Sequence, residues 1–383
     1  MFSLLFNFTG LVAGGVVAYN LGIFDTIPWA LLIYPGILSI RGAIGGLYAG
    51  RLSTALHLGT IKPRIFNNTN ESYVLLNTVN ALTLVSALLM GTLGSIVCIL
   101  VTGTHFSEFF KILSVIVSSM GMSIIVISPL TFWISVTSFN KGLDPDVIVY
   151  PIVSTVADLI ITAIYIGVLF IVIQLPGESL YIFSLINAIF IIGVLYSIKN
   201  IYKKKEFVST VKEYMITLLI ISIIVNITGT ALNGIIEKIG KRPEVFMIYP
   251  ALIDTVGDVG SIIGSTATTK MAVGVMRTEF KAITSHLWEI GSAWTASIIM
   301  FILYTLTSSL VYGIEKLPRL LEEVFFTHMI VVPVIIIISF ATAIITRKRG
   351  LDPDNFVIPI ETSISDGLTT IGLLIAFTLL IFI

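Results

Sequence analysis

Apolar residues occur in long runs along the whole chain, and only short polar connections separate these runs. A run of about 20 apolar residues is long enough to cross the hydrocarbon core of a bilayer as a helix. The connections are too short to hold a soluble domain. The pattern therefore predicts an all-α, polytopic membrane protein with about eleven transmembrane helices. We expect these over residues 4–24, 28–51, 73–102, 108–138, 147–173, 180–198, 209–235, 246–275, 283–312, 323–346 and 355–383.

Composition narrows the environment and the partners. Of the 383 residues, 56% are apolar and only 11% are charged, whereas soluble proteins carry about 25% charged residues. The lipid bilayer is therefore the expected surrounding, and no nucleic-acid partner is expected. Cys98 is the single cysteine and lies in an apolar run, and the four histidines show no metal-ligand spacing, so no thiolate or histidine metal site is expected. Nothing in the sequence indicates an organic cofactor.

Lysine and arginine residues are distributed unequally between the two sides of the predicted membrane region. When successive loops are assigned to alternate sides, fifteen of these residues fall on the side of the N-terminus and six on the other. Arg41 is left inside a span. Basic residues are enriched in cytoplasmic loops. We therefore expect a multi-pass protein of the plasma membrane with a cytoplasmic N-terminus and an external C-terminus.

The sequence contains an internal duplication. Residues 142–158 and 350–366 are identical at nine of seventeen positions, at a constant offset of 208, and a second match pairs Tyr34 with Tyr249 at an offset of 215. The connecting segment would return the chain to the side on which the first copy began, so the copies are expected to be parallel repeats with a transport pathway at their interface. The predicted organisation is a first five-helix unit (1–175), a connecting helix with a basic loop (176–206) and a second five-helix unit (207–383).

Two aspartates, Asp158 and Asp366, occupy equivalent positions in the last helix of each repeat. Each lies seven residues after a proline, which is roughly 10 Å into the span, and a charge that faces lipid at this depth is costly. Each also shares a helical face with hydroxyl side chains. These are Ser154, Thr155 and Thr162 in the first repeat and Thr362, Ser363 and Thr370 in the second. Two carboxylates among hydroxyl oxygens suit a hard cation, and Mg²⁺ in particular is bound through few carboxylates while it keeps several waters.

The intramembrane acids also have structural interpretations. Asp158 and Asp366 would specify packing alone if each only hydrogen-bonded to a neighbouring helix. Asp254 and Asp258 form a second acidic face, and for Asp258 a metal-binding role and a structural role are both consistent with the sequence. Acids favour helix N-termini, so we expect the Asp-Pro-Asp motifs at 144–146 and 352–354 to be helix starts rather than cation-attracting clusters.

The segment Arg51–Ala55, after a glycine-rich span, and the two Asp-Pro-Asp…Pro…Asp motifs are similar to sequences of solute carrier family 41. The membrane unit of that family resembles the bacterial MgtE magnesium channels. The resemblance covers nearly the whole chain, as two MgtE-type units joined by one helix. It implies transport of divalent cations, chiefly Mg²⁺, by a monomer that corresponds to an MgtE dimer.

The resemblance also implies roles for particular residues. The ion-binding aspartate of MgtE-type proteins corresponds to Asp158 and Asp366. The family's Gly-Asn element in the second span, which lines the pore, corresponds to Gly42-Ala43 and Gly257-Asp258, and both copies depart from asparagine. The cytoplasmic sensor domains of MgtE channels have no counterpart in this sequence.

Two other functions compete with divalent cation transport. An intramembrane aspartyl protease would use two aspartates as an acid–base dyad, but the chain lacks a Gly-x-Gly-Asp element, and its two aspartates are copies within duplicated units. An ion-coupled carrier of another solute is the stronger alternative, although no unwound helix with an anion-binding end is evident. We therefore expect a transporter rather than an enzyme, with the cation crossing between the two pseudo-symmetric halves.

Overall fold

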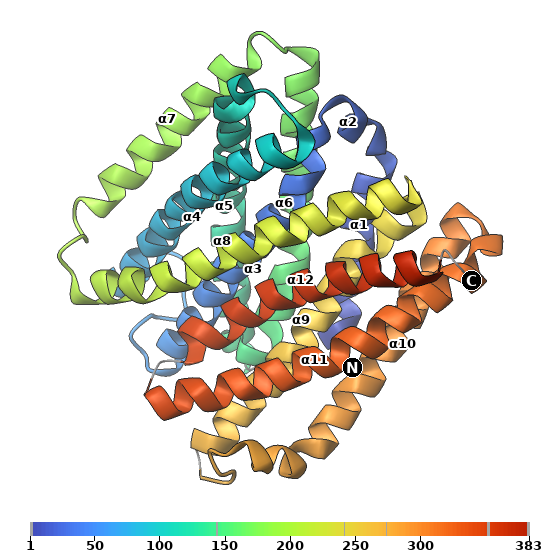
Figure 1. Cartoon of the computed structure of the whole chain (residues 1–383). Coiled ribbons are helices and arrows are strands. Elements are labelled where there is room, and N and C mark those ends of the chain that lie inside the picture. The colour runs from blue at the N-terminus through green and yellow to red at the C-terminus, as the bar shows by residue number, and fades with distance from the viewer. Residues whose placement is uncertain (1–2, 143–144, 241, 273, 351–352, 381–383) are drawn as a thin grey trace. The chain divides into compact units, whose positions relative to one another are not determined.

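The structure, a computed structural model, describes residues 3–142, 145–240, 242–272, 274–350 and 353–380 (Figure 1). Within these ranges all regular structure is helical, and ten helices are long and apolar enough to cross a membrane. They are α3 (Pro28–His57), α4 (Asn70–Thr102), α5 (Phe109–Asn140), α6 (Pro145–Gln174), α7 (Ser179–Ile198), α8 (Lys205–Ile239), α9 (Pro243–Ala272), α10 (Leu287–Tyr312), α11 (Leu317–Arg349) and α12 (Pro353–Leu380). The predicted all-α, polytopic membrane fold is confirmed.

Helix boundaries follow from residues that start or stop a helix. Gly103 and Gly350, with φ of 67° and 64°, end α4 and α11 in the left-handed conformation that glycine adopts most readily. Prolines start α3, α6, α9 and α12, where a missing N–H removes no helical hydrogen bond. The Asp-Pro-Asp motifs therefore coincide with helix starts. Asp144 and Asp352 themselves, and the side chains of Asp146 and Asp354, lie outside the described residues.

The beginning of the chain differs from the single span predicted over residues 4–24. It forms a 3₁₀ turn η1 (Ser3–Asn7), a short helix α1 (Phe8–Tyr19) and a further short helix α2 (Leu21–Thr26). Asn20 ends α1: it leaves the helical conformation (φ −103°), and its side chain donates a hydrogen bond to the carbonyl oxygen of Val16 (2.8 Å). The apolar helical stretch is consequently shorter than a membrane span.

The duplication is visible in the helix boundaries. α3 and α9 are both 30 residues long, and both of their ends correspond at the offset of 215 found in the sequence. α6 and α12 begin at equivalent prolines, Pro145 and Pro353. Helices α3 to α6 therefore recur as α9 to α12.

The chain forms two compact units. The α3–α7 unit comprises Gly22–Asn226, and the α9–α12 unit comprises Met1–Leu21 together with Ile227–Ile383. In the α9–α12 unit, α1 packs along α9, which also contacts α10, α11 and α12 (Figure 1). Compactness thus groups the first residues of the chain with the second repeat. The boundaries proposed from the duplication describe sequence relationship and stay a prediction.

Each unit is built around the helix that carries the repeated Tyr-Pro pair. In the most apolar stretch of α3, 94% of the residues are buried, and in that of α9, 83% are buried. The corresponding share for α7 is 17%. In the α3–α7 unit, α3 contacts α4, α5 and α6. α3 and α9 are therefore the central helices against which functional side chains of the neighbouring helices are placed.

Candidate functional site

Helix α6 carries Asp158 on a buried, hydroxyl-rich face. Asp158 is 1% exposed, and Thr155, Thr162 and Ser154 on the same face are also buried. Thr162 Oγ1 lies 3.0 Å from Tyr34 Oη of α3, so a hydrogen bond joins the two helices one turn beyond the aspartate. The face that the sequence predicts to be polar thus points into the helix bundle.

Arg41 of α3 is the ionic partner of this aspartate. Its Nη2 forms an ion pair with Asp158 Oδ1 and lies 3.5 Å from Ser154 Oγ. The arginine is only 6% exposed, and its Nε has no hydrogen-bond partner among the described residues. In a buried pair each charge compensates the other, and loss of one partner leaves the second uncompensated. The Arg41 guanidinium thus already pairs with the carboxylate that we expect to bind a transported cation.

A small cavity lies beside Arg41 in the α3–α7 unit. Its volume is about 10 Å³, which is close to the space that one water molecule requires. Its lining is mainly apolar and includes Ile44, Val79, Met120 and Ile127 beside Arg41.

Helix α12 presents the equivalent face in the second repeat. Asp366 is 7% exposed, and Thr362, Ser363 and Thr370 are buried with it. Thr370 Oγ1 lies 2.8 Å from Tyr249 Oη of α9. This bond is the counterpart of the one between Thr162 and Tyr34, so both repeats hold their last helix against the central helix in the same register. Val256 of α9, however, stands at the position equivalent to Arg41.

Asp258 of α9 lies in the same unit and is bound by the beginning of the chain. Asn7 Nδ2 donates to Asp258 Oδ2 (2.9 Å) and also lies 3.2 Å from Thr255 Oγ1. Thr255 in turn hydrogen-bonds to Tyr304 Oη of α10 (3.0 Å), and Asp254 lies close enough to interact with the same tyrosine. The acidic face of α9 is thus placed among amide and hydroxyl groups.

The two glycines of the predicted pore element differ in their surroundings. A Cβ atom on Gly257 would lie 3.1 Å from Ser365 Oγ of α12, whereas a Cβ on Gly42 would have no neighbour within 4 Å. Gly257 therefore permits close approach of α9 and α12. This contact places the adjacent residues Asp258 and Asp366 at the same level of the α9–α12 packing. Gly42 has no comparable packing role.

The donor atoms around the aspartates favour a hard ion. Among the described residues, no three His, Cys, Asp or Glu side chains come close enough together to hold a metal ion. Ser154 contributes a hydroxyl group beside the Arg41–Asp158 pair, whereas Asn7 presents its amide nitrogen to Asp258. Carboxylate and hydroxyl oxygens suit an ion that keeps part of its hydration shell, as Mg²⁺ does, better than Zn²⁺, which favours nitrogen and sulfur ligands.

Sequence reasoning missed two partners of the candidate residues. Arg41 is a basic residue inside a span, and the sequence could have indicated its partner: an intramembrane arginine requires an acid, and Asp158 lies deep within a span of the first repeat, whereas Glu108 lies at the edge of one. Asn7 was missed because no sequence signal links it to Asp258, which lies 251 residues away.

Comparison with known proteins gives one family. A model of the MgtE family, described as divalent cation transporter, matches residues 34–168 and 249–376. The two matched segments cover more than half of the chain and contain all four candidate aspartates. No solved structure matches the chain.

Proposed function

The chain belongs to the MgtE divalent cation transporter family, and from this premise we propose that it carries Mg²⁺ across a cell membrane with Asp158 and Asp366 as ion ligands. Family membership makes it a transporter of divalent cations rather than an enzyme, so the protease interpretation is not retained. The identity of the ion, the ligands and the route are the content of the proposal.

One observation carries the proposal: the same buried aspartate on a hydroxyl-lined helix face occurs in both repeats, with the same tyrosine–threonine bond beside it. A buried carboxylate is unfavourable unless it is compensated, and hydroxyl oxygens can complete the surroundings of a partly hydrated Mg²⁺. Asp254 and Asp258 add negative charge in the second repeat. The pore-lining roles of Gly42 and Gly257 belong to the same proposal.

Arg41 gives the two aspartates different tasks. Asp366 and Asp258 are the residues at which the cation first binds. At Asp158 the cation competes with the guanidinium, because one carboxylate oxygen already accepts the ion pair from Arg41. Ligation through Oδ1 of Asp158 therefore requires Arg41 to release this oxygen.

Two features of the sequence support the proposed route and orientation. Parallel repeats place equivalent helices around an axis along the membrane normal, so the pathway is proposed to run between the halves of a single chain. The fifteen-to-six distribution of basic residues supports a cytoplasmic N-terminus and an external C-terminus in the plasma membrane.

Flux into proteoliposomes tests the function. Purified protein is reconstituted with a Mg²⁺-sensitive dye inside the vesicles, and uptake is measured alone and in competition with Mn²⁺, Co²⁺, Ca²⁺ and Zn²⁺. We expect Mg²⁺ uptake in wild type and in Glu178→Gln, which changes an exposed acid, and little competition from Zn²⁺. Transport of Zn²⁺ in preference to Mg²⁺, or no divalent uptake, contradicts the proposal.

A further inference from the structure

One carboxyl group of the α9–α12 unit has no place in the function proposed above. Glu361 of α12 lies five residues before Asp366 and is 0% exposed. Among the described residues, neither of its carboxyl oxygens makes a hydrogen bond of normal geometry. A charged carboxylate in such surroundings is strongly unfavourable unless a proton or a cation accompanies it. Glu361 therefore requires an occupant.

The groups around Glu361 indicate which occupant fits. Ser339 of α11 is the polar residue beside the carboxyl, and its hydroxyl likewise has no hydrogen bond of normal geometry within the described part of the chain. The helices are closely packed here, since a Cβ on Gly260 of α9 would lie 2.9 Å from Ser339 Oγ. A divalent metal ion takes about six oxygen ligands, whereas a proton needs only the carboxylate. One carboxyl and one hydroxyl between packed helices suit a proton.

The first repeat shows that the fold does not need this glutamate. Val153 stands at the equivalent position, 2% exposed, in an apolar cluster that includes Ala49, Ile127 and Ala157. Thr131, the equivalent of Ser339, donates its hydroxyl to the carbonyl oxygen of Ile127 (2.8 Å). The same scaffold therefore packs without an acid, and the glutamate is an addition particular to the second repeat.

Other charged groups lie on the helices packed against α12. α9 carries Asp254 and Asp258 shortly before Gly260, the residue that packs against Ser339, and Lys270 near its end. α12 itself carries Asp366. α11 ends in a basic turn and has His328 in its interior. Among the described residues, none of these groups hydrogen-bonds to Glu361.

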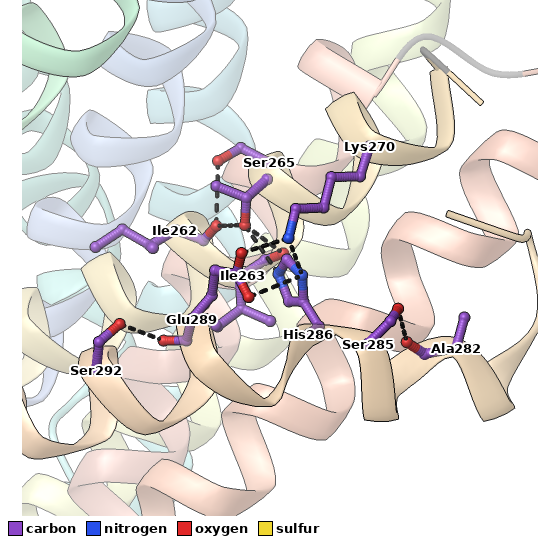
Figure 2. Close-up of polar contacts among 10 residues, drawn as sticks. Ile262, Ile263, Ser265, Lys270, Ala282, Ser285, His286, Glu289 and Ser292 are labelled. Atoms are coloured by element: carbon purple, nitrogen blue, oxygen red, sulfur yellow. Dashed lines mark hydrogen bonds and ion pairs between the residues drawn. The ribbon is translucent and has the colours of Figure 1, made fainter. Parts of the chain in front are cut away.

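A second titratable group is near α11 and has to be separated from Glu361 by experiment. Figure 2 shows His286 beside Lys270 and Glu289: Lys270 Nζ lies 3.4 Å from His286 Nδ1 and forms an ion pair with Glu289. The His286 ring also contacts Phe340, the residue after Ser339, with ring centroids 6.1 Å apart. A pH response of this unit has two possible sources, Glu361 and His286.

We propose that Glu361 is a proton-binding site whose proton exchanges with the transported divalent cation. The inference rests on the function proposed above. Five residues along a helix correspond to roughly 7.5 Å, so a divalent cation at Asp366 raises the positive potential at Glu361 and favours release of the proton. The carboxylate left behind is compensated by the cation. When the cation leaves, Glu361 takes up a proton again, so Mg²⁺ moves in one direction and protons in the other.

The test measures both ions in the same proteoliposomes. Full-length protein is reconstituted with a Mg²⁺ dye and a pH dye inside, and K⁺ with valinomycin clamps the membrane potential so that passive proton leak does not follow Mg²⁺. In wild type we expect Mg²⁺ uptake to make the lumen more alkaline, and uptake to rise severalfold when the lumen is made one pH unit more acidic. Glu361→Gln should abolish both effects. Glu361→Asp should retain proton movement, and Glu315→Gln, an exposed acid of the same unit, should behave as wild type.

Several results would overturn the inference. Proton movement in Glu361→Gln equal to that of wild type would do so, as would a pH response that disappears in His286→Gln and persists in Glu361→Gln. A Na⁺ gradient that replaces the proton gradient through Glu361 would make this a sodium site instead. If Glu361→Gln does not fold, proton movement during Mg²⁺ uptake by wild type and by Glu361→Asp still tests the inference. Mg²⁺ uptake by wild type without proton movement overturns the proton site alone, whereas no Mg²⁺ uptake by wild type refutes the proposed function itself.

Discussion

The last helices of the two repeats share a tyrosine–threonine packing contact but have different electrostatic surroundings. In both, a tyrosine of the central helix hydrogen-bonds to a threonine one turn beyond the buried aspartate. In the first repeat, however, Arg41 compensates Asp158, while in the second Val256 replaces the arginine and Asp258 replaces Ala43. The scaffold was kept after duplication and the charge was redistributed.

This difference separates packing from ion binding. A homodimer must present the same side chains from both subunits, whereas a fused chain is free to place a positive charge in one copy and additional acids in the other. The surroundings of Asp158 in the α3–α7 unit are close to neutral. The surroundings of Asp366 in the α9–α12 unit are acidic. Variants that exchange these properties test whether the asymmetry matters for transport.

Loss of flux is the largest expected effect. Asp366→Asn and Asp158→Asn should each lower Mg²⁺ flux in proteoliposomes by at least about tenfold, because asparagine keeps the size and a carbonyl oxygen but removes the charge that the cation requires. Glu178→Gln serves as the control. Wild-type flux in either variant would mean that the aspartate concerned has only a structural role.

Stability should distinguish the same two variants. Asp158→Asn leaves Arg41 buried without its counter-ion, which should lower the free energy of unfolding by about 3–5 kcal/mol. The double variant Arg41→Met/Asp158→Asn should recover most of this loss. Asp366→Asn should cost less, since no arginine stands at position 256. Denaturant unfolding in detergent micelles measures all three. Equal losses for Asp158→Asn and Asp366→Asn would remove the electrostatic difference between the repeats.

Apparent affinity should show the smallest effect. Asp258→Asn should raise the Mg²⁺ concentration that gives half-maximal flux about three- to tenfold, equivalent to about 0.6–1.4 kcal/mol. The reason is that the acid attracts the cation in a weakly screened environment. Ala43→Asn, at the matching position, should change it less than twofold. Similar shifts in both variants, read from concentration-dependent flux, would argue against a second-repeat acidic site.

Helical periodicity was sufficient to predict the faces of α6 and α12, because a polar stripe on an apolar helix has to point away from lipid. It was not sufficient for contacts between distant segments. The pairing of Arg41 with Asp158 joins residues 117 apart, and that of Asn7 with Asp258 depends on how α1 packs against α9. The break at Asn20 was also missed, since apolar residues continue on both sides of it and hydropathy alone does not detect a helix cap.

The close fit between α1 and α9 has a consequence for biosynthesis. A Cβ on Gly14 would lie 2.1 Å from the carbonyl oxygen of Met247, so glycine is required for this approach. The ribosome makes α1 more than 200 residues before α9, a delay of roughly ten to fifty seconds at about 5–20 residues per second. During that interval α1 has to wait without its partner while Gly22–Asn226 is inserted. The second repeat is therefore completed by a segment made well before it, and α1 cannot take its final place until α9 has been synthesised.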